Sequence, residues 1–198
     1  MTRKVVANIS LSLDGRVAGP GGDFDMGWIV PHAISPQSRA HMVRVTSAAT
    51  TALLGRKNYQ GFAGFWPAVA EDSNAAAEDR AFSRWLNNVE KIVFSETLTE
   101  VEWNNARLAG TDPATAVKQL REQEGNDNVG DIIVLASSSV IRQLLRAGEL
   151  DRLSITLCPE IAGGGARLFD DGFPATSWTL TDSTVTDSGA ICLLYERK

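Results

Sequence analysis

The stretch of sequence that most constrains the fold runs from residue 131 to residue 169. It opens with the apolar run Ile-Ile-Val-Leu, passes through Ser137, Ser138 and Ser139, and continues with the apolar periodicity of a helix. A strand that leads straight into a helix places unpaired N–H groups where a phosphate can bind. The glycine triplet at 163–165, which ends the next predicted strand, lets the backbone approach a ligand closely. Two such sites at adjoining strand ends indicate a nucleotide cofactor, although serine-rich turns are also ordinary helix caps.

Length and charge narrow the class of protein. A chain of 198 residues that is 43% hydrophobic can bury one core, and no linker-like segment divides it, so we expect a single domain over residues 1–198. A net charge of −5, with scattered rather than clustered Arg and Lys, argues against nucleic-acid binding. No apolar run approaches the ~18 residues of a membrane span, and the first residues lack the pattern of a signal peptide. We therefore expect a soluble, cytoplasmic protein.

The two cysteines, Cys158 and Cys192, both lie in apolar, strand-like runs. This placement predicts buried thiols rather than a disulfide. Two His and two Cys without ligand spacing do not indicate a structural metal site, and we predict none.

Short apolar runs alternate with capped helical patterns along the rest of the chain. Strands are predicted at 5–13, 50–54, 91–94, 132–135, 153–157, 178–185 and 190–195. Helices are predicted from Ser35-Pro36, from Gly55-Arg56, over 75–86, and from Asp112-Pro113 to Glu124, where Gly125 ends the helix. The last two strands are joined only by residues 186–189, which predicts an antiparallel hairpin. The pattern indicates an α/β fold in three layers, with a mixed, mostly parallel central sheet and helices on both faces.

Four loops follow predicted strands, at 14–28, 55–58, 95–98 and 136–139. In open α/β sheets, ligands bind beyond the carboxyl ends of the strands. Arg56 and Lys57 place two cations at a helix N-terminus, which suits a phosphate monoester, and Ser95 and Thr97 add hydroxyl donors. Each loop alone is equally compatible with solvated cations and helix caps. Four of them in one chain favour a ligand site.

Several motifs resemble the dihydrofolate-reductase-like superfamily. They are Ser-Leu-Asp-Gly-Arg-Val-Ala-Gly-Pro at 12–20, Leu-Gly-Arg-Lys-Asn-Tyr at 54–59 and Val-Phe-Ser-Glu-Thr-Leu at 93–98. Within it, the chain resembles the branch of the reductase (C-terminal) domain of riboflavin biosynthesis, through Ala136-Ser137, the leucine-rich stretch 141–145, Gly-Glu-Leu-Asp at 148–151 and the segment from Pro159 to Phe169. The resemblance covers nearly the whole chain and is weakest at 68–91. It implies a dihydrofolate-reductase-like fold.

The resemblance also implies NADPH as cofactor. It assigns the adenosine end and its 2′-phosphate to Gly55, Arg56, Lys57, Asn58, Ser95, Thr97 and Leu98. It assigns the pyrophosphate to Ala136, Ser137, Ser138 and Ser139, places Val17 and Ala18 beside the nicotinamide, and adds Gly163 and Gly165 as points of close approach. Arg56 is best suited to select NADPH over NADH, because a fixed guanidinium favours the extra phosphate. The branch usually carries glycine where this chain has Ala136, so we expect weakened pyrophosphate binding or a strained backbone there.

The catalytic acid of dihydrofolate reductases has no counterpart at its expected place. This chain has Trp28 in the loop that precedes that place, but residues 29–70 contain no Asp or Glu. Asp14, Asp25 and Trp28 are therefore the candidate catalytic residues, with His32 and His41 as further proton-handling candidates. Asp14 would also serve as a turn cap, and both histidines as ordinary loop or helix residues. Folate is not the expected substrate.

The segment Ser35-Pro36-Gln37-Ser38-Arg39 resembles the Ser-Pro-x-x-Arg motif of the riboflavin-type reductase. The predicted substrate-binding residues are Trp28, His32, Ser35 and Arg39, with Arg39 meeting an anionic substrate. The resemblance implies a hydride transfer to a small heterocycle of the 5-amino-6-(5-phosphoribosylamino)uracil type. Two alternatives stay open: a reductase of another carbonyl or imine compound or of a pterin, and a non-catalytic nucleotide-binding protein that retains the fold.

A homodimer is the expected assembly, because relatives in this branch commonly pair. The last two strands carry Val185, Ile191, Leu193 and Tyr195, more apolar residues than one sheet edge needs. Burial of these residues under a helix of the same chain would explain them equally well.

Overall fold

The computed structural model describes residues 3–122 and 130–198. Its elements are, in chain order, β1 (Val5–Leu11), η1 (Gly27–Ile29), α1 (Val30–Ala33), α2 (Pro36–Thr46), β2 (Ala49–Gly55), α3 (Arg56–Val69), α4 (Ala77–Asn88), β3 (Glu90–Phe94), β4 (Ala106–Leu108), α5 (Pro113–Glu122), β5 (Asp131–Leu135), α6 (Ser138–Ala147), β6 (Arg152–Leu157), β7 (Trp178–Val185) and β8 (Ile191–Arg197).

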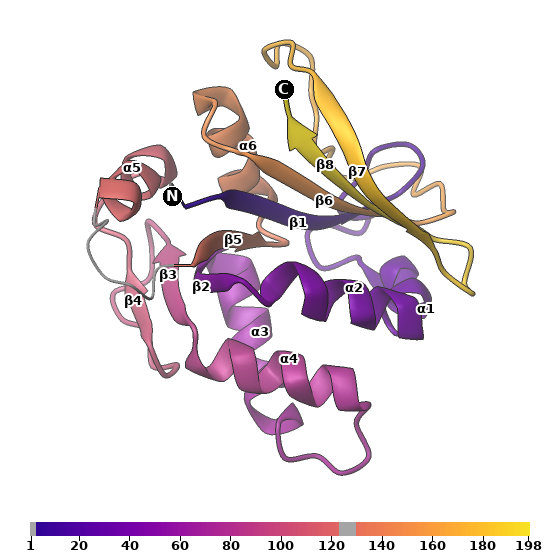
Figure 1. Ribbon diagram of the computed structural model, residues 1–198, viewed down its shortest axis with the longest axis horizontal. Coiled ribbons are helices and arrows are strands. Elements are labelled where there is room, and N and C mark those ends of the chain that lie inside the picture. Colours follow the sequence, from indigo (N-terminus) through magenta and orange to yellow (C-terminus); the bar gives the residue numbers. More distant parts are fainter. Residues whose placement is uncertain (1–2, 123–129) are drawn as a thin grey trace.

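The described strands form one eight-stranded sheet in the order β4-β3-β2-β5-β1-β6-β8-β7 (Figure 1). The pairs from β4 to β6 are all parallel. Strand β8 runs antiparallel to both β6 and β7, so the predicted C-terminal hairpin is confirmed. The carboxyl ends of six parallel strands therefore meet at one edge of the sheet, which is where such folds bind ligands.

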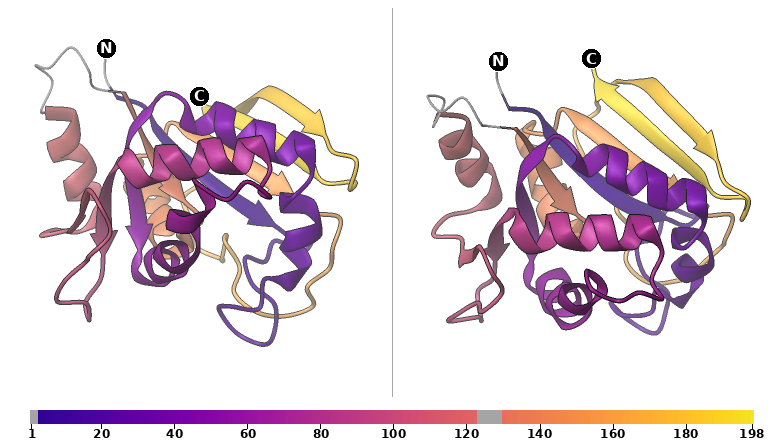
Figure 2. Two further views of the ribbon diagram at one scale, coloured as in Figure 1. Left: turned by 90° about the horizontal axis from the view of Figure 1, so that it is seen from below. Right: turned by 60° about the horizontal axis from the view of Figure 1, so that its bottom comes forward.

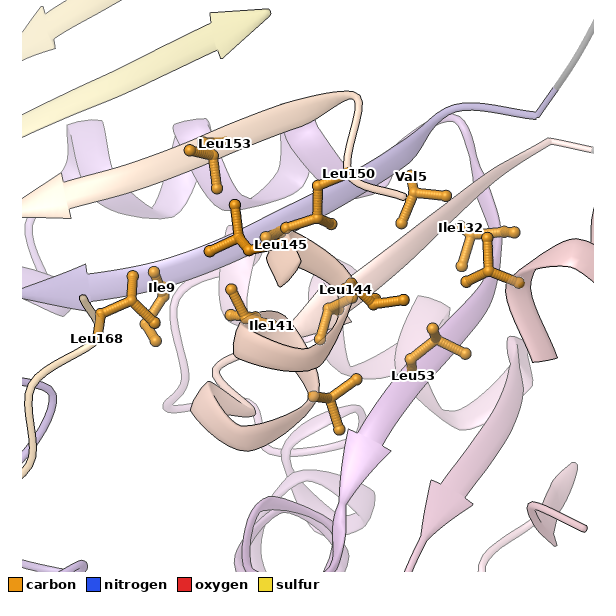
Figure 3. Close-up of a cluster of buried hydrophobic side chains, with 14 of the residues drawn as sticks. Val5, Ile9, Leu53, Ile132, Ile141, Leu144, Leu145, Leu150, Leu153 and Leu168 are labelled. Atoms are coloured by element: carbon orange, nitrogen blue, oxygen red, sulfur yellow. The ribbon is translucent and has the colours of Figure 1, made fainter. Parts of the chain in front are cut away.

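Helices cover both faces of the sheet, as expected for three layers (Figures 1 and 2). On one face, α5 and α6 bury apolar side chains against β1, β5 and β2 (Figure 3). On the other face, α3 and α4 pack against the opposite sides of β2, β3 and β5, with α2 beside them. Alternate residues of β1 show the division: Val5, Ala7 and Ile9 belong to the first cluster and Val6 to the second. A strand buried on both faces is mostly apolar, and the buried Asn8 of β1 is bonded to Ser154 Oγ.

Helix α6 shows how the sequence fixes the layer that supports the site. Val140, Ile141, Leu144 and Leu145 are buried and recur at helical spacing, so one face of α6 packs on the sheet. The helix ends at Gly148, which adopts the left-handed conformation with φ of 74° and donates its N–H to carbonyls of the last turn. Burying four such side chains contributes roughly 1.5–3 kcal/mol each.

The structure departs from the predicted elements in a few places. Strand β1 ends at Leu11 rather than residue 13, because a turn held by the Ser12 hydroxyl begins there. The glycine triplet 163–165 does not end β6; that strand stops at Leu157 and the triplet lies in the loop beyond. Strand β4 has three residues and was not predicted, since so short a run has no periodicity. The predicted end of α5, at Glu124 and Gly125, lies outside the described residues.

Cys158 and Cys192 are buried and unbridged, which confirms the prediction of free thiols. Among the described residues, no helix combines the length and hydropathy needed to cross a bilayer.

Candidate functional site

A cavity of about 720 Å³ opens at the carboxyl ends of β2, β3 and β4. It collects eight of the predicted cofactor residues from three separate turns, namely Gly55, Arg56, Lys57, Asn58, Ser95, Thr97, Ser138 and Ser139. It is completed by Glu96 and by residues that were not predicted as ligands, among them Asp23, Thr111, Asp112 and Gln143. The structure therefore brings together residues as distant in the sequence as Asp23 and Gln143, as expected for strand ends of a parallel sheet.

Three helices point their N-termini at this cavity. Helix α3 begins at Arg56, α5 at Pro113 and α6 at Ser138, and all three residues line it. The first turns of α3 and α6 leave N–H groups for a ligand and carry roughly half a positive charge each, so the cavity favours anionic groups. Asp112 caps α5: its carboxylate accepts hydrogen bonds from the Ala114 and Thr115 N–H groups, and the Thr115 hydroxyl lowers the pKa of Asp112.

The two cations of the cavity differ in how they are held. Arg56 Nη1 donates a hydrogen bond to Gln60 Oε1 at 3.1 Å, within the same helix. Lys57 pairs with Asp23, which reaches across from the glycine-rich loop 14–28. Arg56 thus keeps guanidinium donors for a ligand, whereas an anion at Lys57 competes with Asp23.

Ser95 organises the turn after β3. Its Oγ accepts hydrogen bonds from the Thr97 N–H at 3.1 Å and the Leu98 N–H at 2.9 Å, while its own hydroxyl hydrogen stays available to a ligand. Leu98, predicted as a cofactor residue, packs against the second core cluster instead of lining the cavity.

The turn from β5 into α6 is tied to the turn from β2 into α3. Ser137 Oγ donates to the Leu135 carbonyl and accepts from the Gly55 N–H, both at 2.8 Å. Both of these bonds are to backbone groups of the protein, so the Ser137 hydroxyl fixes the two turns relative to each other. Ser138 and Ser139, in contrast, line the cavity. Ala136, just before, has φ of 47°. The chain therefore holds a β-carbon in a left-handed conformation that glycine adopts without strain.

Asp14 joins the loop after β1 to the glycine triplet. Its carboxylate accepts hydrogen bonds from the Ser12 hydroxyl at 2.6 Å, the Ala162 N–H at 3.0 Å and the Gly163 N–H at 3.2 Å. These bonds, that from Ser12 foremost, lower the pKa of Asp14 to about 2. The group is ionised at neutral pH and anchors two loops, which is a positioning role rather than that of a proton donor.

The glycine-rich loop folds around Asp25. The Asp25 carboxylate accepts the Gly21 N–H at 2.9 Å, and its backbone carbonyl accepts the Gly19 N–H at 2.7 Å. A β-carbon at residue 19 would overlap this carboxylate, so a larger residue there would displace the Asp25 side chain from its bond with Gly21.

The triplet glycines contact this same loop and do not line the cavity. At Gly165, with φ of 85°, a β-carbon would collide with the Ala18 and Gly19 carbonyls. Gly163 donates its N–H to Asp14. Val17 donates to the Ala166 carbonyl at 2.9 Å, and Ala18 is buried. These glycines therefore allow the backbones of the loops after β1 and β6 to pack directly against each other.

Trp28 lies in the short helix η1, where its indole Nε1 is buried without an acceptor among the described residues. A buried N–H of this kind costs about 1–3 kcal/mol unless it finds a partner. Among the predicted substrate-binding residues, Trp28 is therefore the one whose side chain could bind a hydrogen-bond acceptor of a ligand.

The remaining predicted substrate residues are engaged with the protein. His32 is 3.0 Å from Ser188 Oγ and 3.2 Å from Glu160 Oε1. Ser35 caps α2, accepting the Ser38 N–H at 3.3 Å and donating to the His32 carbonyl at 3.0 Å. Arg39 donates from Nε to both carboxylate oxygens of Asp79 at 2.9 Å.

His41 lies on the face of β1 and β6 that α2 covers. Arg44 donates to its Nδ1 at 2.9 Å, so Nε2 carries the hydrogen and donates to Ser154 Oγ at 2.7 Å. Burial, and then the charge of Arg44, lower the pKa of His41 to about 4. It is a neutral, structural histidine.

Comparison with known proteins places this geometry in a family. A family model described as the RibD C-terminal domain matches residues 3–192. YyaP of Bacillus subtilis strain 168, an uncharacterised protein, is 23% identical over 193 residues, which make up 98% of this chain and 94% of that protein.

Two solved structures share the fold over their whole lengths. A protein of Shewanella sp. PV-4 that carries a riboflavin-biosynthesis name has a TM-score of 0.68 at 21% identity, with 100% of this chain and 99% of the other covered. Dihydrofolate reductase from Enterococcus faecalis, solved with NADP(H), has a TM-score of 0.60 at 14% identity and the same coverage. At these identities the likeness shows the fold, and it confirms the expected dihydrofolate-reductase-like architecture.

Proposed function

The chain belongs to the family of the RibD C-terminal domain, and from this premise we propose that it is an NADPH-dependent reductase of a small carbonyl, imine or heterocyclic compound. The observation that carries the proposal is the cavity at the strand ends, where three helix N-termini converge beside Arg56. A cavity with this field and this cation is suited to the phosphates of a dinucleotide.

The residues present fit NADPH. Arg56 would hold the 2′-phosphate with its remaining guanidinium donors, helped by Lys57 once Asp23 is displaced, and the Ser95 hydroxyl would add a hydrogen bond. The backbone N–H groups at the start of α6, with Ser138 and Ser139, would hold the pyrophosphate. The nicotinamide would extend toward the loop 14–28, because Asp23 of that loop already borders the cavity. When bound, the cofactor supplies a hydride.

The chain's own residues would then bind, orient and shield the substrate. Trp28 offers its unpaired N–H to a carbonyl or imine acceptor. The hydrogen bonds of Asp14 and Asp25 fix the two loops, which would border the reacting atoms. Since both carboxylates are engaged in the loops, the proton that follows the hydride would come from solvent rather than from either of them.

A test of this proposal uses NADPH deuterated at the transferable position. The full chain is incubated with a panel of aminopyrimidine ribosides, their phosphates, pterins and simple ketones and imines. We expect cofactor oxidation to require one of these compounds and the product to carry deuterium. NADPH binding without any turnover would favour the alternative of a non-catalytic nucleotide-binding protein, which the strained Ala136 also favours. Failure to bind NADPH would refute both.

A further inference from the structure

Resting on the proposed reductase function, we propose that the substrate is an uncharged carbonyl or imine compound with an apolar substituent, and not a phosphate ester. The substrate end of the site is formed by α1, by the start of α2 and by the loops that follow β1 and β6. Figures 1 and 2 show α1 beyond the carboxyl ends of these two strands. Hydrogen bonds join the three segments, from the Leu13 N–H to the Glu160 carbonyl and between Glu160 and His32.

The cation expected to meet a substrate phosphate is already neutralised. The single Nε–H of Arg39 is shared between both carboxylate oxygens of Asp79, and its Nη1 donates to the Ile34 carbonyl. Both partners of the ion pair are three-quarters buried, where such pairs are far stronger than on the surface. Asp79 lies in the first turn of α4, where the helix field also favours a carboxylate. A phosphate that binds Arg39 would have to displace Asp79, which both the guanidinium and the field of α4 hold in place.

Two further predicted substrate-binding residues, Ser35 and His32, are also hydrogen-bonded within the protein. As the cap of α2, the Ser35 hydroxyl accepts the Ser38 N–H and donates to the His32 carbonyl. His32 is 5% exposed, and both of its ring nitrogens lie within hydrogen-bond distance of Ser188 or Glu160. Glu160 is a carboxylate at this end of the site and repels a phosphate. Ser35, His32 and the Nε and Nη1 groups of Arg39 are therefore all bonded to other groups of the protein.

What the same segments do present is apolar. Leu13 follows β1, Val30 and Ile34 flank His32 in and after α1, and Ile161 follows Glu160; each of these four side chains is more than half exposed. Large apolar side chains left in solvent on neighbouring segments indicate an apolar ligand surface. Trp28 adds one buried N–H to this end. One hydrogen-bond donor on segments that carry exposed apolar side chains matches a carbonyl or imine group on an apolar body.

The test compares matched ligands that differ only in a phosphate. The full chain is first saturated with NADP⁺, so that Arg56 and Lys57 are occupied, and calorimetry then measures binding of an aryl ketone and of the same ketone carrying a phosphate ester. Aminouracil riboside and its 5′-phosphate form a second pair. We expect the unphosphorylated ketone to bind at millimolar concentration or below. We expect the phosphate to change affinity less than about threefold, in the wild type and in Arg39→Ala alike.

Removing the charge of Asp79 should let Arg39 bind a substrate phosphate. In Asp79→Asn the guanidinium is free, and we expect roughly a tenfold gain for the phosphorylated ligands only. Glu78→Gln is the matched control, because it removes the same charge from the same turn without touching Arg39. Arg167→Ala controls for the exposed arginine of the neighbouring loop.

Two results would overturn the inference. One is a gain of about tenfold or more from the phosphate in the wild type, whichever arginine accounts for it; the other is the failure of both unphosphorylated ligands to bind. Neither result touches the proposed reductase function, which fails separately, in the initial cofactor titration, if NADP⁺ and NADPH do not bind.

Discussion

Ala136 holds the least favourable backbone conformation of the candidate site, with φ of 47° immediately before the serine turn. A left-handed non-glycine residue costs of order 1–3 kcal/mol, while glycine adds up to ~1 kcal/mol of unfolded-state entropy. We therefore expect Ala136→Gly to stabilise the fold by about 1 kcal/mol in urea unfolding and to tighten NADPH binding. Ala147→Gly, on the exposed end of α6, is the control and should destabilise by about 1 kcal/mol. Equal losses in both variants would show that the strain is not real.

The buried imidazole of His41 makes stability depend on pH. Its pKa is about 4 in the folded protein, against 6.5 for an ordinary histidine. Above pH 6.5 both states are neutral; as pH falls below that value the unfolded chain takes up a proton that the folded chain refuses, and stability is lost. Between pH 7 and pH 5 this amounts to about 2 kcal/mol.

Urea unfolding at the two pH values checks this prediction. His41→Gln, which can still donate to Ser154, should lose clearly less stability than the wild type over the same interval. The idea would be wrong if the variant and the wild type shared one pH profile.

At the scale of elements, the loops after β1 and β6 form one unit because their backbones touch at Gly165. Gly165→Ala combines a positive φ with a collision against the Ala18 and Gly19 carbonyls. Gly163→Ala has a similar φ, yet its β-carbon meets no atom within 4 Å. We expect about 1 kcal/mol of destabilisation in Gly163→Ala and at least 1 kcal/mol more in Gly165→Ala, together with slower turnover. Calorimetric melting of both variants measures the difference, and equal melting temperatures would contradict it.

The sequence predicted elements better than partners, for a physical reason. Strand and helix positions follow from local periodicity and caps, so the apolar run of β5, the Ser35 cap and the stripe of α6 were all found. The bonds of Ser137 to Gly55 and of Arg39 to Asp79 join residues 82 and 40 positions apart. No local pattern signals such pairings, so the sequence does not predict which protein groups Ser137 and Arg39 contact, and their ligand-binding roles stay predictions.

The glycine triplet shows the same limit. Its residue types correctly signalled a close backbone approach. What approaches Gly165 is another loop of the chain, and only the packed structure identifies that partner. Asp23 and Asp112 were missed as cavity residues because isolated acids in loops carry no motif.

At the scale of the whole molecule, both core clusters share the one sheet, which supports the proposal of a single domain over residues 1–198. Homodimer formation remains a prediction. Of the four residues proposed for its interface, Tyr195 packs on the first core cluster of its own chain, whereas Val185 on the edge strand β7 is 69% exposed. We expect light scattering at micromolar concentration to give the mass of two chains, and Val185→Asp to reduce it toward one. A single-chain mass for the wild type would reject the dimer.

Arg56, at the N-terminus of α3, should select a cofactor with a 2′-phosphate, and titration calorimetry of NADPH and NADH measures that selection. A charge-assisted hydrogen bond contributes about 1.5–3 kcal/mol, so NADPH should bind roughly ten- to a hundred-fold tighter than NADH. In Arg56→Ala we expect that preference to disappear, with NADH affinity nearly unchanged. Equal affinity of the wild type for the two cofactors, or equal weakening of both in the variant, would contradict the account.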